Sequence, residues 1–149
     1  MKRILVALDA SPRAPHVLAA ATSLARSAGA KLRLFRAVPV QADIPWDLLS
    51  NLPPGGVSEL LARIARSELE SLAEEVPAEL LDGAETAVGT AWSMICSAAR
   101  TYDADLIVIG SHGYGVLDHV LGTTASKVVN HASTSVLVVR AANAARPKR

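Results

Sequence analysis

Three glycines and a threonine that follow a short apolar run could together bind a phosphate group. Gly110 comes directly after the β-branched run Leu106–Ile109, which is short enough for a buried strand. Gly113 follows three residues later, and Gly122 stands before Thr123, where a helical pattern begins. Glycines let the backbone approach a ligand closely, and the unpaired amides at a helix N-terminus attract an anion. The pattern therefore indicates an anion site, with phosphate as the expected ligand.

Further side chains near the helix start could support such a site. Thr123 or Thr124 can donate a hydrogen bond to a phosphate oxygen, and Lys127 lies one helical turn further on. Because helical side chains lean toward the N-terminus, the Lys127 ammonium could reach the same anion. The chain has neither a GxxxxGK[ST] loop nor a GxGxxG turn after its first strand. A second interpretation, that the glycines simply make turns, stays open.

The elements that must hold this site alternate between strands and helices. Apolar or β-branched runs predict five strands, at Ile4–Leu8, Leu32–Val38, Thr86–Val88, Leu106–Ile109 and Val136–Val139. Such alternation predicts an α/β domain with an open, mainly parallel five-stranded sheet and helices on both faces. Ligands of these sheets bind at the carboxyl ends of the strands. Those ends are expected at Asp9, the Ala37–Pro39 turn, Gly89 and Gly110.

Capping residues and helical spacing predict where the helices begin and end. Ser11 as N-cap, with Pro12 at the first helical position, predicts the start of the first helix, and Gly29 predicts its end. Arg33 and Arg36 indicate that the second strand is less completely buried than the first. Further helix starts are expected at Ser58, Thr90 and Thr123.

Composition and charge limit the classes of protein to be considered. The chain has 149 residues, half of them hydrophobic, which suits one domain over residues 1–142 and a basic tail over 143–149. Net charge is +1, and without the three basic residues of the tail 12 basic residues stand against 14 acidic ones. A nucleic-acid surface would be more basic, so we expect no nucleic-acid partner. Cys96 stands alone, which predicts a buried thiol rather than a disulfide or a zinc ligand.

Hydropathy gives no sign of a membrane protein. No apolar run approaches the length that spans a bilayer. The run after Met1 is interrupted at Asp9, which is too early for the core of a signal peptide. We therefore expect a cytoplasmic protein without a membrane partner.

The segment from Pro39 to Val57 breaks the alternation of strands and helices. Its prolines and glycines forbid a long regular element, although Trp46 and three leucines give it something to bury. We expect either a flap beside the ligand site, a subunit contact, or a merely mobile loop.

The whole chain resembles the universal stress protein family, from KRILVALDAS at Lys2–Ser11 to SVLVVR at Ser135–Arg140. The most specific part is Gly110-Ser111-His112-Gly113, followed by Gly122-Thr123. Nucleotide-binding members of that family show G-x2-G-x9-G-[ST], whereas this chain has G-x2-G-x8-G-T, one residue shorter. The resemblance implies a Rossmann-like fold of the adenine nucleotide alpha hydrolase type.

The resemblance also implies a ligand and a set of binding residues. The ligand would be ATP, or ADP or AMP, with Mg²⁺ or Mn²⁺ on the phosphates. The first strand end would hold the base and ribose, a backbone group near the second strand end would contribute, and the glycine loop would hold the phosphates. The implied residues are Ala7, Leu8, Asp9, Ala37, Ile109, Gly110, Ser111, His112, Gly113, Gly122, Thr123 and Thr124.

The leading hypothesis for function is a stress-response sensor or regulator that binds an adenine nucleotide. Two alternatives stay open. The shortened loop favours a dimeric interaction module that binds no nucleotide, and a slow ATP hydrolase would need a water-activating residue that the sequence does not reveal. Asp9 does not indicate a phosphoacceptor of the receiver type, because the other acids and the lysine of such a site are missing.

The last strand bears on assembly. Val136–Arg140 is apolar almost throughout, and an open apolar edge is a liability in a monomer. Members of the family commonly pair this strand with its copy, so the resemblance implies a homodimer through Val136–Arg140. The downstream protein partner is not indicated by the sequence.

Overall fold

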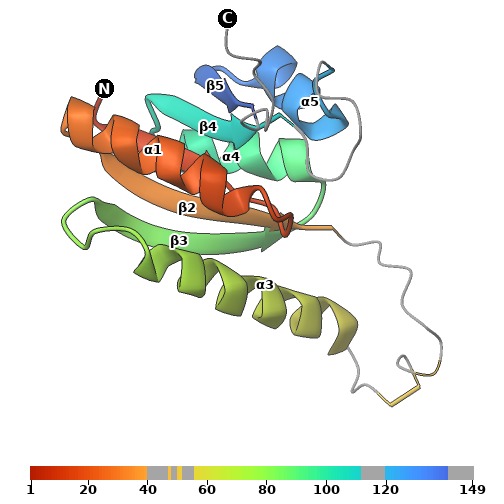
Figure 1. The fold of residues 1–149 in the computed structure, drawn as a ribbon. Helices are drawn as coiled ribbons and strands as arrows, with labels where there is room; N and C mark the ends of the chain where they lie inside the picture. Colours follow the sequence, from red (N-terminus) through yellow and green to blue (C-terminus); the bar gives the residue numbers. More distant parts are fainter. Residues whose placement is uncertain (40–46, 48–49, 52–55, 112–119, 141–149) are drawn as a thin grey trace, which may run out of the picture.

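Strands and helices alternate along the chain in the computed structural model, which describes residues 1–39, 47, 50–51, 56–111 and 120–140 (Figure 1). Much of the loop Pro39–Val57 and the whole tail 143–149, with the expectations attached to them, therefore lie outside the described residues. The elements are β1 (Arg3–Ala7), α1 (Ala14–Ala28), β2 (Lys31–Val38), α3 (Gly56–Glu74), β3 (Leu81–Val88), α4 (Ala91–Tyr102), β4 (Leu106–Gly110), α5 (Thr123–His131) and β5 (Ser135–Val139).

The strands form one sheet in the order β3-β2-β1-β4-β5, and every pair in it is parallel. This confirms the predicted five-stranded α/β architecture of Rossmann-like type. The chain moves outward from β1 through β2 to β3 and then returns to the other side of β1 for β4. That reversal is a topological switch point, where open α/β sheets leave a crevice at the carboxyl ends of the strands.

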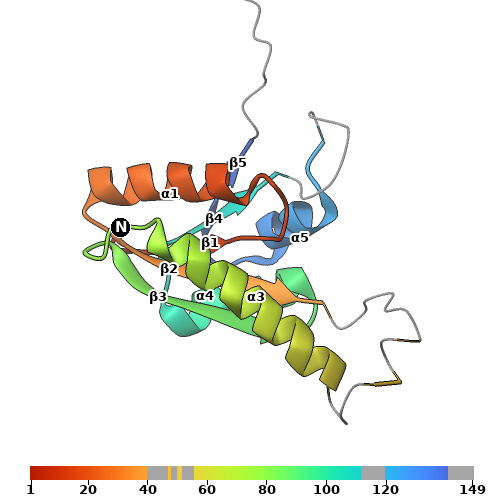
Figure 2. The same ribbon diagram turned by 60° about the horizontal axis from the view of Figure 1, so that its bottom comes forward.

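Alternating side chains of β1 face two separate apolar layers. Ile4 and Val6 pack in the layer shared with α1 and α3, whereas Leu5 and Ala7 pack in the layer shared with α4 and α5. Figure 2 shows helices on both sides of the sheet, as predicted. Because both faces are covered, the inner strands are continuous apolar runs.

The first helix begins later than its capping pattern predicts. The N-cap is Arg13 rather than Ser11, and Pro15 takes the early helical position that was expected for Pro12. The Ser11 hydroxyl accepts the Arg13 amide at 3.3 Å, so its capping ability closes a turn that precedes the helix. The predicted end is confirmed, since Gly29 follows the helix in a left-handed conformation with φ of 64°.

The third strand is longer than the sequence predicts. It extends over Leu81–Val88 rather than Thr86–Val88 and pairs with β2 along most of that length. Asp82 and Gly83 interrupt the hydrophobic pattern by which a strand is recognised in a sequence. They are tolerated in β3 because it lies at the sheet edge, where such residues can face solvent.

Two smaller expectations concern burial and membranes. Cys96 is buried as predicted, and burial raises the pKa of its thiol, which disfavours the reactive thiolate. In the part of the chain that the structure describes, none of the helices is both long and apolar enough to cross a membrane.

The beginning of β1 is tied to the turn before β4 through Asp105. One carboxylate oxygen, Oδ2, accepts the backbone amides of Lys2 at 2.6 Å and Arg3 at 2.9 Å. These two hydrogen bonds lower the pKa of the Asp105 carboxyl from its usual value. A carboxyl group with a lowered folded-state pKa stabilises the fold above its unfolded pKa of about 3.9, and that stabilisation is lost as the pH falls through the folded value.

We expect Asp105→Asn to reduce stability at neutral pH, and the difference from the wild type to shrink below about pH 4. Urea unfolding of both proteins across that pH range measures it. Asp103→Asn is the matched control, because the Asp103 side chain is 92% exposed and asparagine also tolerates its left-handed backbone. A stability difference that stays constant on acidification would contradict the role given to the Asp105 carboxylate.

Candidate nucleotide site

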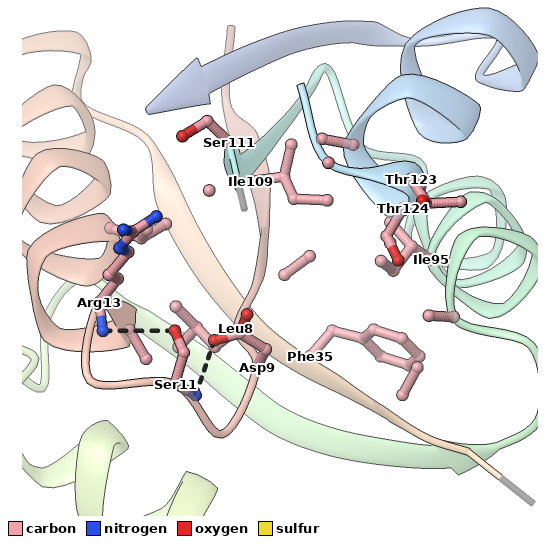
Figure 3. Close-up of a pocket in the computed structure, with 18 residues that line it drawn as sticks. Leu8, Asp9, Ser11, Arg13, Phe35, Ile95, Ile109, Ser111, Thr123 and Thr124 are labelled. Carbon is pink, nitrogen blue, oxygen red and sulfur yellow. Dashed lines mark hydrogen bonds between the residues drawn. The ribbon is translucent and has the colours of Figure 1, made fainter. Parts of the chain in front are cut away.

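A cavity of about 380 Å³ lies where β1, β2 and β4 end and where α1 and α5 begin. Its volume falls within the range of about 300–1,000 Å³ that is usual for small-molecule sites. Figure 3 shows the lining side chains converging from these elements. The lining residues are Ala7, Leu8, Asp9, Ser11, Arg13, Ala14, Val17, Phe35, Ala37, Ala91, Ile95, Ile109, Gly110, Ser111, Gly122, Thr123, Thr124 and Ala125.

The structure brings together nearly all of the site residues expected from the sequence. Two of the expected residues, His112 and Gly113, lie outside the described residues. The expected residues that line the cavity are Ala7, Leu8, Asp9, Ala37, Ile109, Gly110, Ser111, Gly122, Thr123 and Thr124.

One side of the cavity is apolar. Ala7 of β1 is in register with Phe35 of β2 and with Ile109 of β4, so the three side chains reach the cavity at the same level of the sheet. Ala37 and Ile95 complete this side from β2 and α4. Such a surface suits a flat, weakly polar group such as a purine base.

The other side is rich in backbone amides and hydroxyls. The Ser111 amide donates to the Val139 carbonyl at 3.0 Å, and the Gly122 amide donates to the Ser111 carbonyl at 2.7 Å. These bonds tie Ser111, at the first end of the glycine loop, to the end of β5 and to Gly122 at the beginning of α5. Gly122 is the N-cap of α5 and has no side chain that could cap the helix. The first-turn amides, together with Thr123 and Thr124, therefore lie at the cavity as donors for an anion.

The turn after β1 is fixed from two directions. The Asp9 carboxylate accepts the Ser11 amide at 2.9 Å, and the Asp9 carbonyl accepts Nη2 of Arg36 at 2.9 Å. Nη1 of Arg36 also donates to Glu68 of α3 at 2.5 Å. β2 is less completely buried than β1, as predicted, but Arg33 contributes to this and Arg36, which is only 6% exposed, does not. The charge of Arg36 is tolerated because the buried guanidinium donates to the half-exposed Glu68 carboxylate and to the Asp9 carbonyl.

Sequence reasoning missed eight lining residues, which are Ser11, Arg13, Ala14, Val17, Phe35, Ala91, Ile95 and Ala125. Phe35 carried a usable signal, because it stands two residues before Ala37 on the same face of a strand. Arg13 was hidden by the assumption that the helix begins at Pro12. Lys127 was expected at the anion, but it is exposed and does not line the cavity.

Neither the histidines nor the acids build a metal site in the described residues. His131 stacks on Trp92 with ring centroids 4.5 Å apart, and His16 contacts the Arg140 carbonyl. No group of three or more His, Cys, Asp or Glu lies together in the described residues. Asp9 is the only acidic residue that lines the described cavity, so a divalent ion there would depend mainly on phosphate oxygens.

The comparisons with known proteins agree on one family. The family model described as the universal stress protein family matches residues 1–140. Universal stress protein A homolog 1 from Coxiella burnetii is 33% identical over 141 residues, which cover 93% of this chain and 95% of the relative.

Solved structures are similar over nearly the whole chain. Universal stress protein UspA from Lactobacillus plantarum is 29% identical with a TM-score of 0.69, and the match covers 93% of this chain and 97% of that one. A universal stress protein from Archaeoglobus fulgidus, solved in complex with dAMP, is 22% identical with a TM-score of 0.61, covering 94% and 98%. At that identity the second likeness shows the fold alone.

Proposed function

The chain belongs to the universal stress protein family, and we propose that its cavity binds an adenine nucleotide, with ATP favoured over ADP and AMP. The observation that carries the proposal is that one cavity, at the switch point of the sheet, has an apolar side and a side rich in hydrogen-bond donors. An apolar side suits the base, and a helix start with glycine as its N-cap and two threonines suits the phosphates. The dAMP complex of the Archaeoglobus relative is consistent with this ligand class.

The nucleotide would act as a signal rather than as a substrate that turns over quickly. Asp9 is the only described lining residue that could serve as a base, and its carboxylate already accepts the Ser11 amide. Mg²⁺ or Mn²⁺ would accompany ATP and reduce the charge of its phosphates. We therefore propose a stress-response sensor or regulator whose conformation or contacts depend on bound nucleotide.

Calorimetric titration tests the proposal. We expect ATP with Mg²⁺ to bind the wild type at one site per chain with micromolar affinity, and the double variant Thr123→Val, Thr124→Val to bind about tenfold more weakly. Valine keeps the shape of threonine and removes only the hydroxyl. Ser133→Val, at an exposed position beyond the other end of α5, is the control and should bind as the wild type does. Folded wild-type protein that binds no adenine nucleotide would leave an interaction module as the better account.

We also propose that the protein is a homodimer through Val136–Arg140. Among the described strands, β5 pairs with β4 along one edge and with none along the other, and Leu137 is 41% exposed. Pairing with a second copy of β5 would satisfy that edge. Light scattering at micromolar concentration should give twice the chain mass of 15.6 kDa. A single-chain mass under those conditions would rule the dimer out.

A further inference from the structure

Arg13 is a cation on the opposite side of the cavity from the beginning of α5. In Figure 3 its side chain leaves the beginning of α1 across the cavity from Thr123 and Thr124. Among the described lining residues it is the only lysine or arginine. On the basis of this placement, and resting on the proposed nucleotide site, we propose that Arg13 is a specificity-determining residue that makes the cavity select phosphorylated nucleosides over the free nucleoside.

The electrostatic balance of the cavity supports this role. The described lining residues include one cation, Arg13, and one anion, Asp9, so their formal charges cancel. Without Arg13 the Asp9 carboxylate would face the phosphate uncompensated. The N-termini of α1 and α5 both open on the cavity, and both ends carry partial positive charge. A phosphate between them would meet a guanidinium from one side and the α5 amides and hydroxyls from the other.

The backbone of Arg13 is held independently of its side chain. Its amide donates to the Ser11 hydroxyl at 3.3 Å, and its carbonyl accepts the amides of His16 and Val17. The Arg13 side chain makes no capping bond to α1. A substitution that keeps an unbranched side chain therefore preserves these backbone bonds of the turn while it removes the guanidinium.

The test compares the affinities of adenosine and AMP for the wild type, Arg13→Gln and Arg13→Lys. We expect Arg13→Gln to weaken AMP binding about 10- to 100-fold and to leave adenosine binding unchanged. Arg13→Lys should recover part of the loss, since lysine keeps the charge but not the planar fork of donors. Arg26→Gln in the last turn of α1 is the matched control and should change neither affinity. Added salt should also lower the AMP affinity of the wild type more steeply than that of Arg13→Gln, because salt screens the attraction between Arg13 and the phosphate.

The outcomes separate this inference from the proposed function. Equal losses of adenosine and AMP binding in Arg13→Gln would assign Arg13 a structural role and overturn the inference alone. Unchanged AMP binding in that variant would also overturn it while leaving the nucleotide site intact. Failure of the wild type to bind either compound would overturn both the nucleotide site and the role of Arg13.

Discussion

Replacing Phe35 by alanine is expected to lower the free energy of unfolding by about 3 to 5 kcal/mol. Phe35 is the only phenylalanine in the chain, is 2% exposed and lies in the apolar layer between the sheet and α4. The rest of that layer consists largely of aliphatic and small side chains, which cannot move far enough to fill the space of a lost ring. The cost therefore combines lost transfer free energy with a cavity beside the ligand site.

Urea unfolding followed by circular dichroism measures the effect of Phe35→Ala. Phe35→Leu is the matched variant, because it keeps most of the volume and should cost clearly less. Phe35→Ala should also weaken nucleotide binding, since the ring lines the apolar side of the cavity. A destabilisation below about 1 kcal/mol would mean that the ring is not part of a well-packed core.

Gly110→Val is expected to weaken nucleotide binding by about 100-fold or more, which corresponds to about 2.7 kcal/mol. Gly110 lies at the end of β4 and lines the cavity. A Cβ atom there would lie 3.1 Å from Cγ2 of Val17, so even alanine forces Val17 to shift. Valine adds two methyl groups, and the resulting overpacking should also cost about 1 to 3 kcal/mol of stability.

Two controls distinguish a loss of affinity caused by a filled cavity from one caused by a less stable protein. Ile107→Val lies on the same strand, fully buried and away from the cavity lining, and should cost about 0.5 to 1.5 kcal/mol without changing affinity. In a double-mutant cycle, Val17→Ala should lower the free energy of unfolding less in the Gly110→Ala background than in the wild type. The smaller side chain at position 17 makes room for the new Cβ at position 110. Wild-type affinity in folded Gly110→Val would remove Gly110 from the binding site.

Local sequence patterns predicted which strands and helices form better than they predicted the residues at which these begin and end. The buried strands β1 and β4 are continuous apolar runs. Gly29 ends α1 and Thr90 is the N-cap of α4, both as expected. β3 and the first turn of α1 depended on tertiary context instead. β3 is an edge strand, and such a strand needs no hydrophobic pattern. Ser11 accepts a hydrogen bond within the turn before α1, and that turn is held by the Asp9 carboxylate and the Arg36 guanidinium.

The candidate site was predictable where one stretch of chain supplies it and less so where packing brings segments together. Gly110, Gly122 and Thr123 follow one another in a recognisable order around the beginning of α5. Arg13 and Ile95 reach the cavity only because β1 and β4 are neighbours at the switch point and α4 covers one face of the sheet. The sequence contains no local signal for that juxtaposition.

The central claim is that an adenine nucleotide occupies the cavity at the carboxyl ends of β1, β2 and β4. Amide-resolved NMR during titration with ATP and Mg²⁺ tests it most directly, because it reports where the ligand binds as well as whether it binds. Saturable shifts should gather at Leu8, Ala37, Gly110, Gly122 and Thr124, while amides of the distant β3 edge such as Asp82 stay unchanged. Saturable shifts elsewhere, or none in folded protein at millimolar ATP, would contradict the claim.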